Sequence, residues 1–285
     1  MTDPGGPGDA LFVPDGDLFV PTHFTEGPWD PGAQFGGSPS SLFATLVEAV
    51  PTLVPMQVAR FTVDLLRPVP LTPLRPTVRI VREGKRIQVV EASLWSGELE
   101  VARCSTLRFR MVDLGDLDLP TGEASNPLPE HPNEPKTEIF PGRRPPGSRF
   151  AVEYLFEETG GFFTNPIWVR LRVPVVAGQP ASPMARIAYL ADLASGIGGP
   201  TDPPIRSINA DLSINVTRYP VGEWIHITGT TRMSRAGVGQ TAATLSDTSG
   251  MVATVALARL IDPPLQDTTP SGHGGGDRVG PARPG

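Results

Sequence analysis

Cysteine, histidine and lysine are scarce in this chain of 285 residues. The single cysteine, Cys104, excludes an internal disulfide framework and a thiolate metal cluster. The four histidines are scattered along the chain and show no metal-ligand spacing. The sequence therefore implies no bound metal and no cofactor.

Long apolar runs, excess positive charge and a secretory leader are also missing. No run of about 18 apolar residues occurs, so we predict no membrane span. The formal net charge is −6, which argues against a nucleic-acid-binding protein. Residues 1–9 lack the basic start and apolar run of a signal peptide. We therefore expect a cytoplasmic protein.

Proline and glycine are abundant by contrast, and they divide the chain. Residues 113–148 contain the stretches NPLPEHPNEP and PGRRPPG, which predict a Pro-rich linker. Residues 263–285 have almost no apolar side chains, and we predict a disordered tail there and a disordered N-terminus at 1–9. Two blocks of similar size remain as candidate domains, 10–112 and 149–262.

The two blocks resemble each other, beginning with one predicted helix in each. Ser38-Pro39 and Ser182-Pro183 each provide an N-cap and a first-turn proline, with an offset of 182 − 38 = 144. Each helix has one apolar face, formed by Leu42, Phe43, Leu46, Val47 and Val50 in the first and by Ile187, Leu190, Ala191 and Ala194 in the second. Gly196 is the predicted end of the second helix.

Strand-like segments follow both helices at a constant spacing. Phe61 to Pro68 resembles Leu212 to Pro220, and Val101 to Arg108 resembles Val252 to Arg259. The two pairs share one offset, since 212 − 61 and 252 − 101 both give 151. One helix followed by several strands, occurring twice, indicates an internal duplication.

The repeated unit has a simple packing solution. An antiparallel sheet can curl around an apolar helix, which then becomes the core of the unit. That arrangement is a hotdog fold, and two such units usually pair edge to edge with a shared groove. We therefore predict an α+β chain that forms a double hotdog. It consists of two fused hotdog domains, each an antiparallel sheet curled around a long central helix.

Several short motifs also resemble one known family. Gln34 to Gly37 resembles its F-G-G turn, Phe61 to Pro68 its strand ending in L-R-P, and Val81 to Lys85 the hairpin turn that follows. Trp168 to Arg172 resembles its W-F-R-L-R strand, and Asp211 to Trp224 its D-H-S…R-P…E-W segment. In their order and spacing, these motifs resemble the type II, medium-chain acyl-CoA thioesterases.

The resemblance implies an enzyme of fatty acid metabolism that hydrolyses fatty acyl-CoA to a free fatty acid and CoA. In the family, an Asp, a Thr and a Gln orient the attacking water. Asp211 falls on the Asp position, and the Thr position falls at Arg232, with Thr231 and Ser234 close by. The Gln position falls at residues 257–258, Leu and Ala, whose side chains form no hydrogen bonds.

Asp211 is the candidate base for this hydrolysis. It begins a predicted strand beside apolar Ile208, and partial burial would raise its pKa. The alternative is a solvent-exposed Asp at the end of a strand. Thr231 or Ser234 would help to position the water. Arg232 either binds a CoA phosphate or pairs with Asp211 and lowers the pKa of that carboxyl.

Gly36 and Gly37 directly precede the first predicted helix. Backbone N–H groups at a helix N-terminus carry partial positive charge, so these glycines are candidates for binding the thioester oxyanion. The alternative is a tight turn that needs glycine for a positive φ.

Other functions remain open at this point. The missing Gln motivates a catalytically impaired acyl-CoA-binding or regulatory protein, and a purely structural module would have a filled groove. The absence of a Gly-x-Ser-x-Gly motif disfavours a serine hydrolase, and the lack of a histidine soon after Asp211 disfavours a hydratase. We expect acyl-CoA as the partner and a homodimer formed through sheet edges or faces.

Overall fold

The computed structural model describes residues 9–28, 30–119, 127–128, 145–156, 166–197 and 206–262. Most of the predicted linker and all of the predicted tail lie outside these residues, as does nearly all of the N-terminal segment 1–9. Within the described part of the chain, no helix is long and apolar enough to cross a bilayer.

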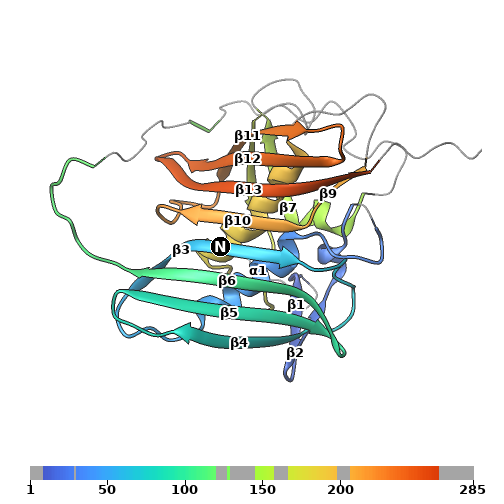
Figure 1. Cartoon of the computed structure of the whole chain (residues 1–285), viewed down its shortest axis with the longest axis horizontal. Helices are drawn as coiled ribbons and strands as arrows, with labels where there is room; N and C mark the ends of the chain where they lie inside the picture. Colours follow the sequence, from blue (N-terminus) through green and yellow to red (C-terminus); the bar gives the residue numbers. More distant parts are fainter. Residues whose placement is uncertain are drawn as a thin grey trace, which may run out of the picture.

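One continuous antiparallel sheet of eleven strands forms the main layer of the molecule (Figure 1). Its strands follow the order β4-β5-β6-β3-β10-β13-β12-β11-β8-β7, and β9 pairs with β13 beside this path. The first half supplies β3 (Met56–Leu65), β4 (Arg75–Arg82), β5 (Ile87–Ser96) and β6 (Leu99–Arg110). The second half supplies β7 (Val152–Phe156), β8 (Ile167–Leu171), β9 (Arg206–Asn209), β10 (Asp211–Val216), β11 (Ile225–Met233), β12 (Val238–Asp247) and β13 (Gly250–Asp262).

Alternating burial along the strands gives the sheet an inner and an outer face. In β10, Leu212, Ile214 and Val216 are buried, whereas Ser213 is partly buried and Asn215 is exposed. Successive side chains of a strand point to opposite faces, so the apolar residues of β10 face the core and its polar residues face outward. The side on which a residue falls therefore decides whether it can meet the helices.

The two halves meet where β3 pairs with β10, between the blue-green and the orange parts of Figure 1. Thr62 lies opposite Ser213 in this pairing, and 213 − 62 equals the 151-residue offset of the repeats. Equivalent residues thus face each other at the seam, which is the signature of a pseudo-twofold axis between duplicated units. The predicted duplication and the predicted double hotdog are confirmed.

Two helices, α1 (Gly37–Glu48) and α2 (Pro183–Ala191), pack against each other on the inner side of the sheet. They run in opposite directions, because Glu48 at the end of α1 contacts Ser182 at the start of α2. A 3-10 helix, η3 (Asp192–Gly196), continues α2. The predicted apolar face of α2 is buried, and one core cluster joins residues of both halves.

The two helix starts differ, although their sequences are similar. Ser182 caps α2 as predicted, since its Oγ accepts a hydrogen bond of 3.0 Å from the Ala185 N–H. The N-cap predicted at Ser38 is wrong, because α1 begins at Gly37 and Gly36 is its N-cap residue. Ser38 lies inside the first turn, where its buried Oγ has no hydrogen-bond partner.

The N-terminal hairpin links the two halves by a second route. It consists of β1 (Phe12–Asp15) and β2 (Leu18–Pro21). The N–H groups of Leu11 and Phe12 each donate a 2.9 Å hydrogen bond, to the carbonyls of Pro174 and Val175. The first residues of the predicted domain 10–112 are therefore attached to the second half of the chain.

Candidate active site

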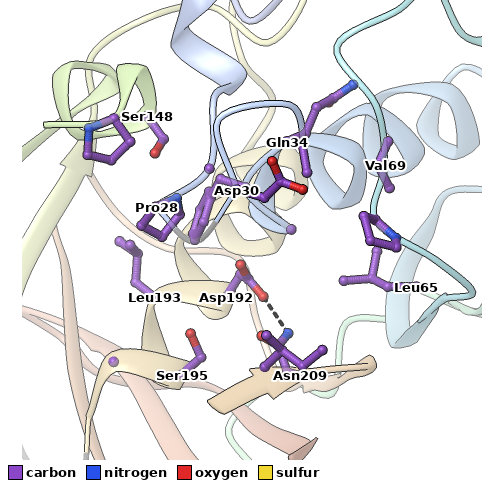
Figure 2. A pocket seen from close by; sticks show the side chains of 18 of the residues that line it. Pro28, Asp30, Gln34, Leu65, Val69, Ser148, Asp192, Leu193, Ser195 and Asn209 are labelled. Carbon is purple, nitrogen blue, oxygen red and sulfur yellow. Dashed lines mark hydrogen bonds between the residues drawn. The ribbon is translucent and has the colours of Figure 1, made fainter. Parts of the chain in front are cut away.

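A cavity of about 440 Å³ lies between the two halves, beside the start of α1 and the end of α2 (Figure 2). Apolar side chains form much of its wall: Ala33, Phe35, Leu65, Val69, Leu193 and Ile208. A few polar groups interrupt this wall, with Asp192, Ser195 and Asn209 from the second half among them. A mostly apolar hollow with a few convergent polar groups is typical of a small-molecule site.

Asp192 is the central polar group of this wall. It is the first residue of η3 and is only 2% exposed. Asn209, at the end of β9, donates a 2.7 Å hydrogen bond from Nδ2 to Asp192 Oδ1, the dashed line in Figure 2. The two polar side chains therefore come from different elements and meet at the cavity.

Burial raises the pKa of Asp192 to about 6, well above the ordinary value of 3.8. The hydrogen bond from Asn209, the backbone N–H of Gly37 and the charge of Arg259 all act in the opposite direction. A carboxyl group with a pKa near 6 is ionised at neutral pH and is still basic enough to accept a proton. This is the range to which general bases are tuned.

Gly36 and Gly37 bring the start of α1 close to this carboxylate. A Cβ atom on Gly36 would lie 3.0 Å from Asp192 Oδ2, and one on Gly37 would lie 2.5 Å from the Tyr189 carbonyl oxygen. Neither glycine has a positive φ, so the tight-turn explanation of this pair is wrong. Gly37 is needed because α2 lies too close for a side chain, and a Cβ on Gly36 would press on the side chains of Asp192 and Leu65.

A buried cation lies behind Asp192. Arg259, on β13, is 8% exposed and donates hydrogen bonds to the Ser207 hydroxyl, the Ser195 carbonyl and the Thr241 hydroxyl. Thr241 and Thr231 share a 2.7 Å hydrogen bond, and Thr231 donates to the Ile197 carbonyl. Arginine and two hydroxyls thus form one polar chain across the inner face of the sheet.

The predicted site residues fall on two different faces. Gly36 lines the cavity, and the N–H of Gly37 faces Asp192. Asp211, Arg232 and Ser234 instead line a second, more open pocket together with Gln240 and Ala258. The catalytic roles assigned to Asp211 and Ser234 and the substrate-binding role assigned to Arg232 remain predictions.

Asp211 is held on the outer face by its strand. It starts β10 with the outward parity of Ser213, and its Oδ1 accepts a 2.5 Å hydrogen bond from the Ala258 N–H. Partial burial raises its pKa, and this hydrogen bond opposes the rise. Thr231 differs from its neighbour Arg232, since its hydroxyl joins the inner polar chain behind Asp192.

Sequence reasoning missed Asp192, Asn209 and Arg259, although the repeat carried a signal for two of them. Asp192 is equivalent to Glu48 at the helix offset, since 192 − 48 = 144. Arg259 is equivalent to Arg108 at the strand offset, since 259 − 108 = 151. A carboxylate at the end of each helix and an arginine on the matching strand could have been found from these offsets.

The equivalent carboxylate of the first half, Glu48, has different neighbours. Glu48 accepts hydrogen bonds from the hydroxyls of Ser182 and Tyr219, so each of its two oxygens has a partner. Tyr219 corresponds to Pro68 at the strand offset, since 219 − 68 = 151, and Pro68 lines the open cavity. A phenol ring therefore stands in one half where the other half has a smaller proline.

These features define the class of the protein: a double hotdog with an apolar cavity between its halves and a buried carboxylate in the cavity wall. The chain belongs to the acyl-CoA thioesterase family. The family model described as the acyl-CoA thioesterase N-terminal domain matches residues 25–109, and the one described as the C-terminal domain matches residues 123–256.

Solved structures show the same fold. An acyl-CoA thioesterase II from Mycobacterium marinum is 17% identical, with a TM-score of 0.60 and coverage of 81% of this chain and 90% of that one. A tesB protein from Mycobacterium avium subs paratuberculosis is also 17% identical, with a TM-score of 0.55 and coverage of 86% and 93%. A hot dog fold protein of unknown function from Alicyclobacillus acidocaldarius is 13% identical, with a TM-score of 0.62 and coverage of 90% and 98%. A search of curated proteins finds no match.

Proposed function

We propose that the protein hydrolyses acyl-CoA thioesters in this cavity and that Asp192 is the base that activates water. Asp192 takes a proton from the water molecule, and the water oxygen attacks the carbonyl carbon of the thioester. The C–S bond then breaks, so that the products are the carboxylic acid and CoA, whose thiolate takes up the proton. One observation carries the proposal: a buried carboxylate with a raised pKa in the wall of an apolar cavity.

The start of α1 supports the step in which negative charge develops. Gly36 lines the cavity at the positive end of the helix dipole, where an N–H group can donate to an oxyanion. The N–H of Gly37 is directed at Asp192, so in this proposal it orients the base. Loss of one oxyanion donor costs about 10²–10³ in rate.

The apolar wall supports an acyl group as the bound part of the substrate. Leu65, Val69 and Ile208 are among the side chains that would contact a hydrocarbon chain. Removal of such a chain from water is favourable by roughly 0.8 kcal/mol for each CH₂ group buried. The predicted homodimer and the cytoplasmic location remain predictions, and light scattering measures the first of them.

The test compares two conservative variants, Asp192→Asn and Asp211→Asn, with the wild type. Release of free thiol from a panel of saturated acyl-CoAs is followed, and acyl-CoA binding is measured by calorimetry. Loss of turnover in Asp192→Asn with retained binding supports the proposal, and loss only in Asp211→Asn would instead support the outer pocket as the site. Tight binding without turnover by the wild type would identify an acyl-CoA-binding protein.

A further inference from the structure

We propose that Arg259 is a positioning residue for the reaction, which fixes Asp192 and Asn209 in their shared geometry by joining the two elements that carry them. This inference rests on the proposed function. Arg259 does not itself line the cavity, so it would act only through the residues that do.

The contacts of the guanidinium carry the argument. Its Nη1 donates to the carbonyl of Ser195, which lies three residues after Asp192 in the same 3-10 helix. Its Nε donates a 2.9 Å hydrogen bond to the hydroxyl of Ser207, which lies two residues before Asn209 on β9. One rigid, planar group therefore ties η3 to β9.

The register of the sheet places Arg259 directly beside Asn209. The two residues are paired across β13 and β9. Thr241, the third partner of the guanidinium, connects it through Thr231 to the carbonyl of Ile197, immediately after η3. Two carbonyls of the segment that carries Asp192 are thus held by this one polar chain.

Arg259 is also a charge within reach of Asp192. It forms no salt bridge within the described residues, so its charge is available to act on the Asp192 carboxylate, and it lowers the pKa of that group. The other titratable side chains near Asp192 are Tyr189 on α2 and, in the cavity wall, Asp30, Arg67, Arg149 and Tyr154. Burial raises the pKa of both tyrosines, so they stay neutral near Asp192. Arg259 is the cation that acts on the carboxylate from outside the cavity wall.

Arg108 provides a matched control inside the same chain. It is the repeat equivalent of Arg259, it is 4% exposed, and it donates to the carbonyls of Val47 and Val50 at the end of α1. It also donates a 2.9 Å hydrogen bond to the side chain of Gln88. Arg108 thus performs the same helix-end role beside Glu48, and neither of these two residues lines the cavity. A purely structural function would make the two arginines equivalent.

The experiment measures the pH profile of kcat/KM in the full-length variants Arg259→Met and Arg108→Met. For Arg259→Met we expect the midpoint of the acid limb to move to higher pH. We also expect kcat/KM at pH 7 to fall by about 10- to 100-fold, since small displacements of a catalytic group are costly. For Arg108→Met we expect a similar loss of stability and the wild-type midpoint. Equal midpoints in the two variants would overturn the proposal.

Two further measurements keep the test decisive. Arg259→Lys retains the charge but loses the planar fork of the guanidinium. We therefore expect the wild-type midpoint with a reduced kcat, and full wild-type kinetics would contradict the positioning role.

The carboxyl titration of Asp192 is followed by ¹³C NMR, with Asp192→Asn to assign the signal. If the wild type hydrolyses no acyl-CoA, the proposed function fails. The effect of Arg259 on Asp192 is then tested by itself, by whether Arg259→Met, and not Arg108→Met, raises this pKa.

Discussion

Replacement of Asp192 by Asn should lower activity and raise stability at the same time. A pKa raised from 3.8 to about 6 means that the folded state disfavours the ionised carboxylate by about 3 kcal/mol. The stability linked to this group is fully present below pH 4 and is lost as the pH rises through 6. Asn cannot ionise, so the variant should be more stable than the wild type at pH 8, by up to about 3 kcal/mol.

The same substitution removes the proposed base. General-base catalysis contributes typically about 10²–10⁴-fold, so kcat should fall by about that factor at pH 7. In the wild type, kcat/KM should rise with pH through a midpoint near 6 and level off above it, because only the ionised carboxylate accepts a proton. Thiol release between pH 5 and 8 measures the first effect, and urea unfolding at pH 4 and pH 8 measures the second.

Glu48→Gln is the control for this experiment. Burial also raises the pKa of Glu48, but Glu48 does not line the cavity, and the hydroxyls of Ser182 and Tyr219 donate to its two oxygens. The variant should therefore leave kcat unchanged. If Asp192→Asn is inactive but also less stable at pH 8 than the wild type, Asp192 is a structural residue. If Asp192→Asn keeps the wild-type kcat, the assignment of the base is wrong.

Three further predictions concern helix packing, one ion pair and one buried hydroxyl, and each is checked by urea unfolding. Gly37→Ala should destabilise the protein by about 1–3 kcal/mol, because the new methyl group would overlap the start of α1 with α2. Arg218→Ala should cost about 1.5–3 kcal/mol at pH 7, since Asp247 loses its bidentate partner but keeps the N–H donors of Val221 and Ser249. The loss should shrink in acid as Asp247 is protonated. Tyr219→Phe should cost about 1–3 kcal/mol and leave thiol release unchanged, because only the hydrogen bond to Glu48 and the one from a backbone N–H disappear.

The fold could be predicted from the sequence because the repeat constrains it at two levels. The apolar faces of the two helices and the two strand pairs at a common offset require the same packing twice. The offset of 151 even predicts which residues meet at the seam, since Thr62 and Ser213 are related by it. Such long-range patterns survive small errors in the bounds of individual elements.

The site could not be predicted in the same way, because one extra residue between the β9 and β10 pairings decides which side chains face inward. β10 pairs with β13 as Ser213 to Ala256, and β9 pairs with β13 as Asn209 to Arg259. Four residues on one strand thus match three on the other, and this irregularity turns Asn209 toward the cavity while Asp211 faces outward. No local pattern in the sequence marks the position of this bulge.

Asp192 was hidden for a different reason. It directly follows the buried apolar face of α2, where a periodicity argument looks for the end of the helix and counts an acidic residue as solvent-exposed. The carboxylate is tolerated there because Asn209 and the start of α1, a helix from the other half, satisfy it. Partners so distant in sequence can be recognised only once the chain is folded.

The antiparallel helices also explain why fusion of the two units matters. Each helix-end carboxylate belongs to one unit and sits on the helix start of the other, so neither unit could assemble such a place alone. A homodimer of identical single units would contain two identical carboxylate sites. Within one polypeptide the two copies can differ in sequence. Glu48 can therefore link the two helices through its hydrogen bonds, while Asp192 lies in the wall of the cavity.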